Sequence, residues 1–202
     1  MGSVDWGLDQ LVDYTPPLTA AADFHQFWHN NLEQSSQVPL NPSFERLHDL
    51  LPGACVYDAS FDGVDGVRVR GWFITPEGSP ESLPTVVKFI GYSGGRSLAH
   101  VHAHHVLNGF NVFVMDSRGQ GGDTGLHLNT THGARRGFIT HGILDEREYY
   151  FRAFYLDAVR AVEVACGRPE VDAKRIAAIG GSQGGALTIA CASLSDRVAA
   201  MA

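Results

Sequence analysis

The chain has 202 residues, of which 44% are hydrophobic and 18% are charged, and its formal net charge is -7. This composition is typical of a soluble globular domain with a substantial core, and the acidic balance without a long Lys and Arg run argues against a nucleic-acid partner. No stretch approaches the roughly 18 apolar residues of a spanning helix, so we also expect no membrane partner.

The cysteines indicate a reducing compartment. Cys55, Cys166 and Cys191 are odd in number and widely spaced. That pattern favours buried, reduced thiols over a disulfide framework. The N-terminus lacks a basic segment followed by an apolar run, which is the pattern of an export signal. We therefore expect a cytoplasmic protein.

Residues 1–50 are expected to form an N-terminal wrap of short helices and extended chain. This segment holds aromatic residues and several prolines but no strand-like alternation. Residues 23–32 are predicted to form one amphipathic helix. The remainder, residues 51–202, is predicted to be one α/β domain.

The domain opens with two predicted strands, residues 55–61 and 67–74. Gly63, Asp65 and Gly66 separate them, which indicates an antiparallel hairpin. Apolar runs then alternate with helix-length segments, and this alternation predicts parallel strands in the rest of the sheet. The predicted strands are 85–90, 111–115, 175–179 and the beginning of one at 197–202, and the predicted helices are 98–108, 149–166 and 184–194.

Residues 180–184, Gly-Gly-Ser-Gln-Gly, join a predicted strand to a predicted helix. A serine on such a sharp turn projects its hydroxyl above the sheet, and only small residues fit two positions before and after it. Gly180 and Gly184 occupy those positions, which makes Ser182 the candidate nucleophile. Two alternatives are a turn that merely packs and a phosphate-binding turn. The Gly-Lys-Ser/Thr ending of a phosphate loop is absent.

The same geometry predicts two backbone donors for an oxyanion. One is the amide of Gln183. The other comes from the Gly-rich loop 91–95 after the strand 85–90, with Tyr92 as the expected donor. A plain flexible loop is the alternative for residues 91–95.

A serine nucleophile needs a histidine base, and in the predicted fold the acid and the histidine follow the serine in sequence. All ten histidines precede Ser182, and Asp196, the only acid after it, lies too early for this role. We therefore expect an α/β-hydrolase sandwich of three layers that is C-terminally truncated, with its triad Asp and His beyond residue 202. The chain alone is then expected to be close to inactive.

Other polar residues have less specific interpretations. His100 and His104 are one helical turn apart, as in some zinc sites, but no fitting carboxylate or Cys lies near them in sequence. A solvated or packed helix face is the competing interpretation, and we expect neither a metal nor another cofactor. Asp116, at the end of its strand, is expected to organise loops.

Four motifs carry a resemblance to a known family. They are residues 91–96, 115–121, 142–145 with Tyr149 and Tyr150 soon after, and 180–185. From about Asp23 to Ala202 the chain resembles the acetyl xylan esterase / cephalosporin C deacetylase family, and the Arg-Gly-Gln triplet, Arg118 to Gln120, is more discriminating than the serine motif.

The resemblance implies a serine esterase that deacetylates small substrates such as xylo-oligosaccharides and cephalosporin C. It implies a ring-like homohexamer with inward-facing sites and no metal. By the same resemblance, Ser182 is the nucleophile and the amides of Tyr92 and Gln183 form the oxyanion hole. Structural support of the site is expected from Arg118, Gly119, Gln120, Gly180 and Gly184. A serine peptidase or lipase of the same fold, and an inactive fragment used for binding, are the alternatives.

Overall fold

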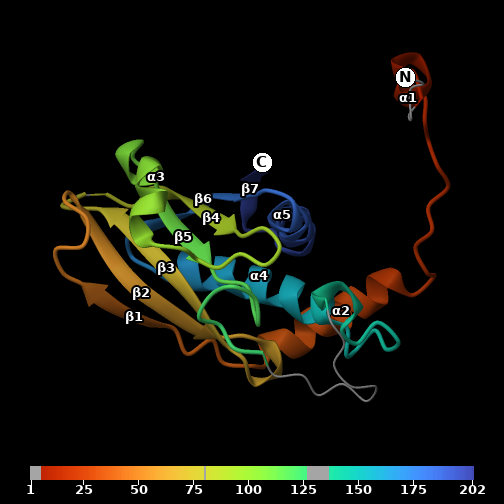
Figure 1. Ribbon diagram of the computed structural model, residues 1–202, viewed down its shortest axis with the longest axis horizontal. Helices are drawn as coiled ribbons and strands as arrows, with labels where there is room; N and C mark the ends of the chain where they lie inside the picture. The colour runs from red at the N-terminus through yellow and green to blue at the C-terminus, as the bar shows by residue number, and fades with distance from the viewer. Residues whose placement is uncertain (1–5, 80, 127–136) are drawn as a thin grey trace.

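The computed structural model describes residues 6–79, 81–126 and 137–202 (Figure 1). Its strands are β1 (Ser43–Leu47), β2 (Ala54–Asp62), β3 (Arg68–Pro76), β4 (Leu83–Phe89), β5 (Asn111–Met115), β6 (Val171–Gly180) and β7 (Val198–Met201). Its α-helices are α1 (Leu8–Val12), α2 (Phe24–Ser36), α3 (Ala103–Leu107), α4 (Tyr150–Cys166) and α5 (Gln183–Leu194). Short 3-10 helices are η1 (Val64–Gly66), η2 (Ala99–His102) and η3 (Phe138–Thr140).

The strands form one mixed sheet in the order β1-β2-β3-β5-β4-β6-β7. Pairing is antiparallel from β1 through β2 and β3 to β5. It is parallel from β5 through β4 and β6 to β7. The antiparallel opening strands and the parallel strands after them are therefore confirmed.

Helices cover both faces of the sheet, which gives the predicted three layers (Figure 1). Successive side chains of a strand point to opposite faces. On β5, Phe113 and Met115 pack in the core beneath α4 and α5, whereas Val112 and Val114 pack in the core on the side of α3. β5 is buried along its whole length, as the apolar run after Asn111 predicts.

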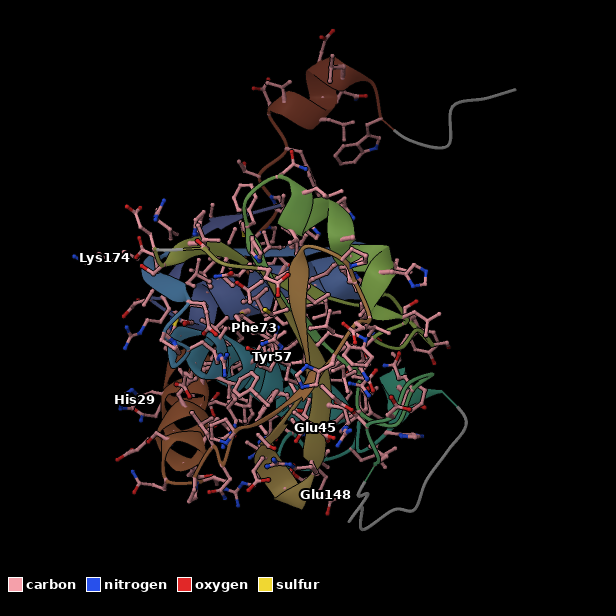
Figure 2. The ribbon with its side chains drawn as sticks, turned by 90° about the vertical axis from the view of Figure 1, so that its left-hand side faces the viewer. His29, Glu45, Tyr57, Phe73, Glu148 and Lys174 are labelled. Carbon is pink, nitrogen blue, oxygen red and sulfur yellow. The ribbon has the colours of Figure 1, made fainter. Side chains whose placement is uncertain are left out.

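The hairpin β2–β3 is confirmed. Its turn contains Asp65 and Gly66 in the left-handed region, with φ of 59° and 73°. Tyr57 and Phe73 are directly paired across the two strands, and their ring centroids lie 6.0 Å apart. Figure 2 labels both side chains, which lie close together on the sheet.

Residues 1–50, expected to form short helices and extended chain, also contain the strand β1, which pairs with β2 along the edge of the sheet. Phe44 lies edge-on to Phe73, at 5.9 Å between ring centroids, while most of the strand is exposed. A short edge strand with one face in solvent needs few apolar residues, so it has little hydrophobic pattern.

The helix predicted at 98–108 is instead the 3-10 helix η2 followed by the single-turn helix α3. The other predicted helices agree with α2, α4 and α5 within a few residues. Within the described ranges, no helix is both long enough and apolar enough to cross a membrane. Cys55, Cys166 and Cys191 are free, as predicted, but Cys55 and Cys166 are only partly buried.

Candidate active site

Ser182 lies at the corner where β6 ends and α5 begins. It is exposed, and its backbone has φ 56° and ψ -122°, a conformation that L residues rarely adopt. Strain of this kind persists only where the surrounding structure imposes it, and it is concentrated at functional sites. The backbone therefore presents the Ser182 side chain to solvent at the N-terminus of a helix.

Two glycines make the corner sterically possible. A Cβ on Gly180 would lie 2.9 Å from Cα of Gly184, and a Cβ on Gly184 would lie 2.5 Å from the carbonyl oxygen of Phe89. Contacts this short are not found for real Cβ atoms. In contrast, a Cβ on Gly181 would meet nothing within 4 Å. The close packing of the turn therefore requires glycine at positions 180 and 184.

The loop after β4 lies against this corner. A Cβ on Gly91 would be 3.6 Å from the carbonyl oxygen of Gly181. Tyr92 follows, with its ring 44% exposed and its hydroxyl accepting a hydrogen bond from the amide of Phe138 at 3.2 Å. Within the described part of the chain, neither the backbone amide of Tyr92 nor that of Gln183 donates a hydrogen bond. Both amides are therefore available to an acceptor.

Gln120 connects the two segments that carry these amides. Its Oε1 accepts a hydrogen bond from the amide of Ser93 at 2.7 Å. Its Nε2 lies 3.0 Å from Oε1 of Gln183 and 2.8 Å from the hydroxyl of Tyr150. That hydroxyl donates to the carbonyl oxygen of Arg118 at 2.8 Å. Gln120 thus connects the loop after β4, the start of α5 and the start of α4.

Arg118 is anchored by a buried ion pair with Asp157 of α4. Its Nε donates to Oδ2 of Asp157 at 2.6 Å, and the two residues are 2% and 1% exposed. Burial raises the pKa of Asp157, while Arg118 and the amide of Val64 oppose that shift. Arg118 therefore reaches into the core rather than toward Ser182. Gly119, the next residue, has φ 65°, and a Cβ there would lie 2.6 Å from Cβ of Leu126.

Asp116 organises the neighbouring loops, as its position at a strand end predicts. It is fully buried, and its carboxylate accepts four backbone amides. The donors are Arg96 and Ser117 at 3.0 Å, Asp123 at 2.6 Å and Thr124 at 2.8 Å. The loops after β4 and β5 also touch through glycine, because a Cβ on Gly95 would lie 2.5 Å from Cα of Gly122.

The two histidines with zinc-like spacing, His100 and His104, do not share one α-helix. His100 belongs to η2 and His104 to α3, and both are exposed. His102, between them, is buried and bonds the carbonyl oxygen of Arg96 through Nε2 at 3.0 Å. Among the residues placed in the structure, no group of three or more His, Cys, Asp or Glu side chains could hold a metal ion.

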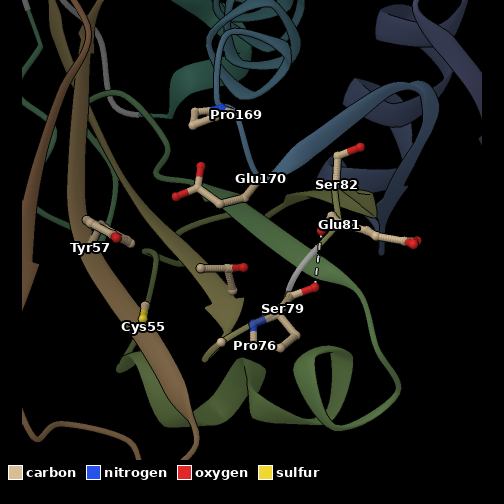
Figure 3. Close-up of a pocket in the computed structure, with 10 residues that line it drawn as sticks. Cys55, Tyr57, Pro76, Ser79, Glu81, Ser82, Pro169 and Glu170 are labelled. Atoms are coloured by element: carbon tan, nitrogen blue, oxygen red, sulfur yellow. Dashed lines mark hydrogen bonds between the residues drawn. The ribbon is translucent and has the colours of Figure 1, made fainter.

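A cavity of about 330 Å³ lies at the other end of the sheet (Figure 3). Its lining includes Glu170, just before β6, and Ser82, just before β4. The hydroxyl of Ser79 donates to the carbonyl oxygen of Glu81 at its rim, at 3.1 Å. Ser182 instead follows the C-terminal end of β6, where parallel sheets place their functional sites. This cavity is therefore separate from the candidate active site.

Three residues of the site could not be assigned from the sequence. Tyr150 stands out there only as part of a motif, and Asp157 and Arg96 have no predicted role. Asp157 shows no signal in its own segment, because a lone acid in an amphipathic helix is usually solvated. Arg96 is buried, donates to Asp58 at 2.7 Å, and stacks over the ring of Trp72 at 3.9 Å.

The comparisons with known proteins agree with this architecture. The chain resembles a solved acetyl xylan esterase from a Paenibacillus species, with 41% identity, a TM-score of 0.93, and coverage of 97% of this chain and 63% of that one. It also resembles acetyl xylan esterase 1 from a Thermoanaerobacterium species, with 31% identity, a TM-score of 0.91, and coverage of 98% and 62%. These likenesses confirm the α/β-hydrolase fold.

A curated relative, acetyl esterase Axe7A of Xylanibacter ruminicola, is 26% identical over 187 residues, which span 88% of this chain and 42% of the relative. The chain thus spans less than two thirds of the length of each of these proteins. A family model described as acetyl xylan esterase matches residues 1–202. The chain belongs to the acetyl xylan esterase family.

Proposed function

We propose that the complete protein is a serine esterase that removes acetyl groups from acetylated xylo-oligosaccharides, with Ser182 as its nucleophile. The observation that carries the proposal is the position of Ser182, which is exposed at the junction of β6 and α5 and has a positive φ of 56°. The two backbone amides without an acceptor, those of Tyr92 and Gln183, support it. Membership of the acetyl xylan esterase family supports the choice of substrate.

In the proposed reaction, Oγ of Ser182 attacks the acetyl carbonyl carbon and its proton passes to a histidine base. The carbonyl oxygen becomes an oxyanion, which accepts hydrogen bonds from the amides of Tyr92 and Gln183. One such donor is typically worth about 3 to 4 kcal/mol. The bond between the acetyl carbonyl carbon and the sugar oxygen then breaks, and the sugar oxygen takes up that proton and leaves as a hydroxyl. Water then attacks the acetyl-serine, which releases acetate and restores the serine.

The histidine and the aspartate that orients it are proposed to lie in sequence that follows Ala202 in the complete protein. All ten histidines of this chain precede Ser182, whereas the order serine, acid, histidine is usual in this fold. The greater length of the family members supports the same assignment. The chain of residues 1–202 alone is accordingly proposed to be inactive.

Three further parts of the proposal rest on the family resemblance or on composition. Cephalosporin C is a second substrate, because it also carries a small acetyl ester. The complete protein forms a homohexamer with inward-facing sites, and its partner is the small acetylated substrate rather than nucleic acid or membrane. It works in the cytoplasm, consistent with its three free cysteines.

The test is hydrolysis of p-nitrophenyl acetate and acetylated xylo-oligosaccharides by the complete protein and its Ser182→Ala variant. Loss of the nucleophile is expected to lower kcat on the order of a millionfold. Ser193→Ala is the matched control, because Ser193 is an exposed serine on the same helix, α5. Residual activity of Ser182→Ala near that of Ser193→Ala would refute the proposal.

A further inference from the structure

A polar groove runs along one side of α2. Four side-chain amides line it, from Gln26, Asn30, Asn31 and Gln34. Residues 26, 30 and 34 are spaced four apart, so they lie on one face of the helix. Arg147 and Arg152 line the groove as well, and its volume is about 420 Å³. We call this feature the amide groove.

The amides of the groove retain hydrogen-bonding capacity. Nε2 of Gln26 donates to Oδ1 of Asn30 at 2.7 Å. This leaves Oε1 of Gln26 and Nδ2 of Asn30 without a partner among the described residues. One is an acceptor and the other a donor, and they lie on adjacent turns. A hydroxyl group can satisfy both, because it donates and accepts.

The base of the groove is held rigid. Asn31 is buried, its Nδ2 donates to the carbonyl oxygen of Phe27 at 2.8 Å, and its Oδ1 accepts from Nε of Arg152 at 2.5 Å. Arg152 also pairs with Asp65 at 3.5 Å. A side chain fixed in this way loses little entropy when a ligand binds, which favours affinity.

An aromatic hollow of about 310 Å³ continues the amide groove. Phe24, Phe27 and Trp28 line it, and the two cavities share Asp23, Phe27 and Glu146. Phe24 is 45% exposed, and the rings of Phe27 and Trp28 pack edge to face with centroids 5.3 Å apart. Amide side chains followed by aromatic rings suit a sugar chain, whose rings carry hydroxyls at the edge and C–H groups on the face.

The charges of the lining disfavour an ionic ligand. Asp23 and Glu146 contribute two negative charges, and Arg147 and Arg152 contribute two positive charges. The lining is therefore neutral overall, so it favours neither a polyanion nor a polycation. Each cavity also falls within the range of about 300 to 1,000 Å³ that is usual for small-ligand sites.

We propose that the amide groove and the aromatic hollow form a binding site for a neutral xylo-oligosaccharide, separate from the candidate active site. The choice of xylose units rests on the proposed function, whereas the preference for a neutral sugar rests on the lining. The first turn of α4 contributes one residue to this site, Arg152, and another, Tyr150, that contacts the active-site loops. Arg152 follows two residues after Tyr150, whose hydroxyl is 2.8 Å from Nε2 of Gln120.

The test is titration of the complete Ser182→Ala protein with xylotetraose that carries no acetyl groups, measured by calorimetry. Binding is expected to weaken at least about tenfold in Gln26→Ala/Asn30→Ala, because two hydrogen-bonding side chains are lost. Phe24→Ala is expected to weaken it about threefold through loss of an aromatic contact. Glu33→Ala, an exposed residue of α2 outside the groove, is the matched control and leaves the affinity unchanged.

Absence of detectable binding at about 10 mM xylotetraose, or an unchanged affinity in the double variant with an unchanged circular dichroism spectrum, would overturn the inference. The proposed function is judged separately, by the p-nitrophenyl acetate assay on the protein that retains Ser182. Esterase activity without xylotetraose binding refutes only the sugar site. Binding that depends on Gln26 and Asn30, without esterase activity, refutes only the proposed function.

Discussion

The side-chain amides of Gln120 and Gln183 pair with each other, 63 residues apart in sequence. Nε2 of Gln120 lies 3.0 Å from Oε1 of Gln183, and Nε2 of Gln183 lies 3.2 Å from Oε1 of Gln120. Because Gln120 also accepts from the amide of Ser93, a single side chain fixes the spacing between the segments that carry the two candidate oxyanion donors.

Replacement of Gln120 by Ala should therefore impair catalysis more than folding. We expect kcat of the complete protein on p-nitrophenyl acetate to fall on the order of 10- to 100-fold, because displacement of a catalytic group by about 1 Å can cost 100-fold. Steady-state kinetics and thermal melts would measure the two effects. Gln37→Ala, which removes an exposed amide after α2, should change neither.

Ser182→Gly should abolish esterase activity and raise the free energy of unfolding. Glycine adopts φ 56° and ψ -122° without the steric strain that a side chain incurs there, so a gain of about 1 kcal/mol is expected. Urea denaturation would measure it. Ser182→Ala retains a Cβ and the strain, and a gain of equal size in that variant would contradict this explanation.

Gly180→Ala should destabilise the fold strongly, because the new methyl group would overlap the backbone of Gly184. We expect a loss of about 2 kcal/mol or more, as for overpacked interiors. Gly181→Ala is an informative control, since a Cβ added there would meet no atom within 4 Å and the φ of Gly181 is not positive. Equal melting temperatures for the two variants would argue against the tight turn.

Asp116→Asn should be about as damaging as Asp116→Ala, although it is the closer mimic in shape. Each carboxylate oxygen accepts two amides, and an Asn side chain would turn its NH2 group toward one of these pairs of donors. Buried donors without acceptors cost about 1–3 kcal/mol each. Chemical denaturation should therefore show a loss of at least about 2 kcal/mol. Asp196→Asn, at an exposed turn after α5, provides the comparison.

Stability should fall as the pH drops from about 6.5 to about 4. Burial, followed by the nearby charges of His104, Lys88 and His102, lowers the pKa of His105 to about 4. Burial also lowers the pKa of His102. The unfolded chain therefore binds protons in this range that the folded chain does not, and the stabilisation is complete above the unfolded pKa of about 6.5.

Urea midpoints measured between pH 7 and pH 4.5 would test this dependence. His105→Gln should flatten it, because the variant has no proton to bind at that position. His29→Gln, on an exposed part of α2 (Figure 2), is the control. An unchanged pH dependence in His105→Gln would show that other groups determine the acid sensitivity.

The sequence predicts the elements whose own residues repeat with a clear period. β5 is predicted at its observed bounds, because four of its five residues form one continuous apolar run. β6 begins earlier than predicted, since Asp172 and Lys174 interrupt its apolar pattern. β1 was missed because it is a mostly exposed edge strand whose register depends on β2.

The residues of the candidate site also fall into those that the sequence could predict and those that it could not. The corner at Ser182 could be predicted because its requirements fall within five consecutive residues. The contacts of Gln120 with Tyr150 and of Arg118 with Asp157 join residues 30 and 39 apart. Such contacts depend on how α4 packs against the sheet, and no local period encodes that packing. The role of Asp116 was predictable only because it terminates a buried strand.

The close approach of Gly95 to Gly122 has a consequence for how this protein can vary. Two loops that follow different strands touch here, so residue 95 cannot gain a side chain unless the backbone at Gly122 moves, and residue 121 cannot gain one unless the backbone at Ser93 moves. Natural diversity at these positions should therefore be correlated, and loop grafting should succeed only when both segments are transplanted as a unit. A library that randomises residue 95 alone should return mostly glycine.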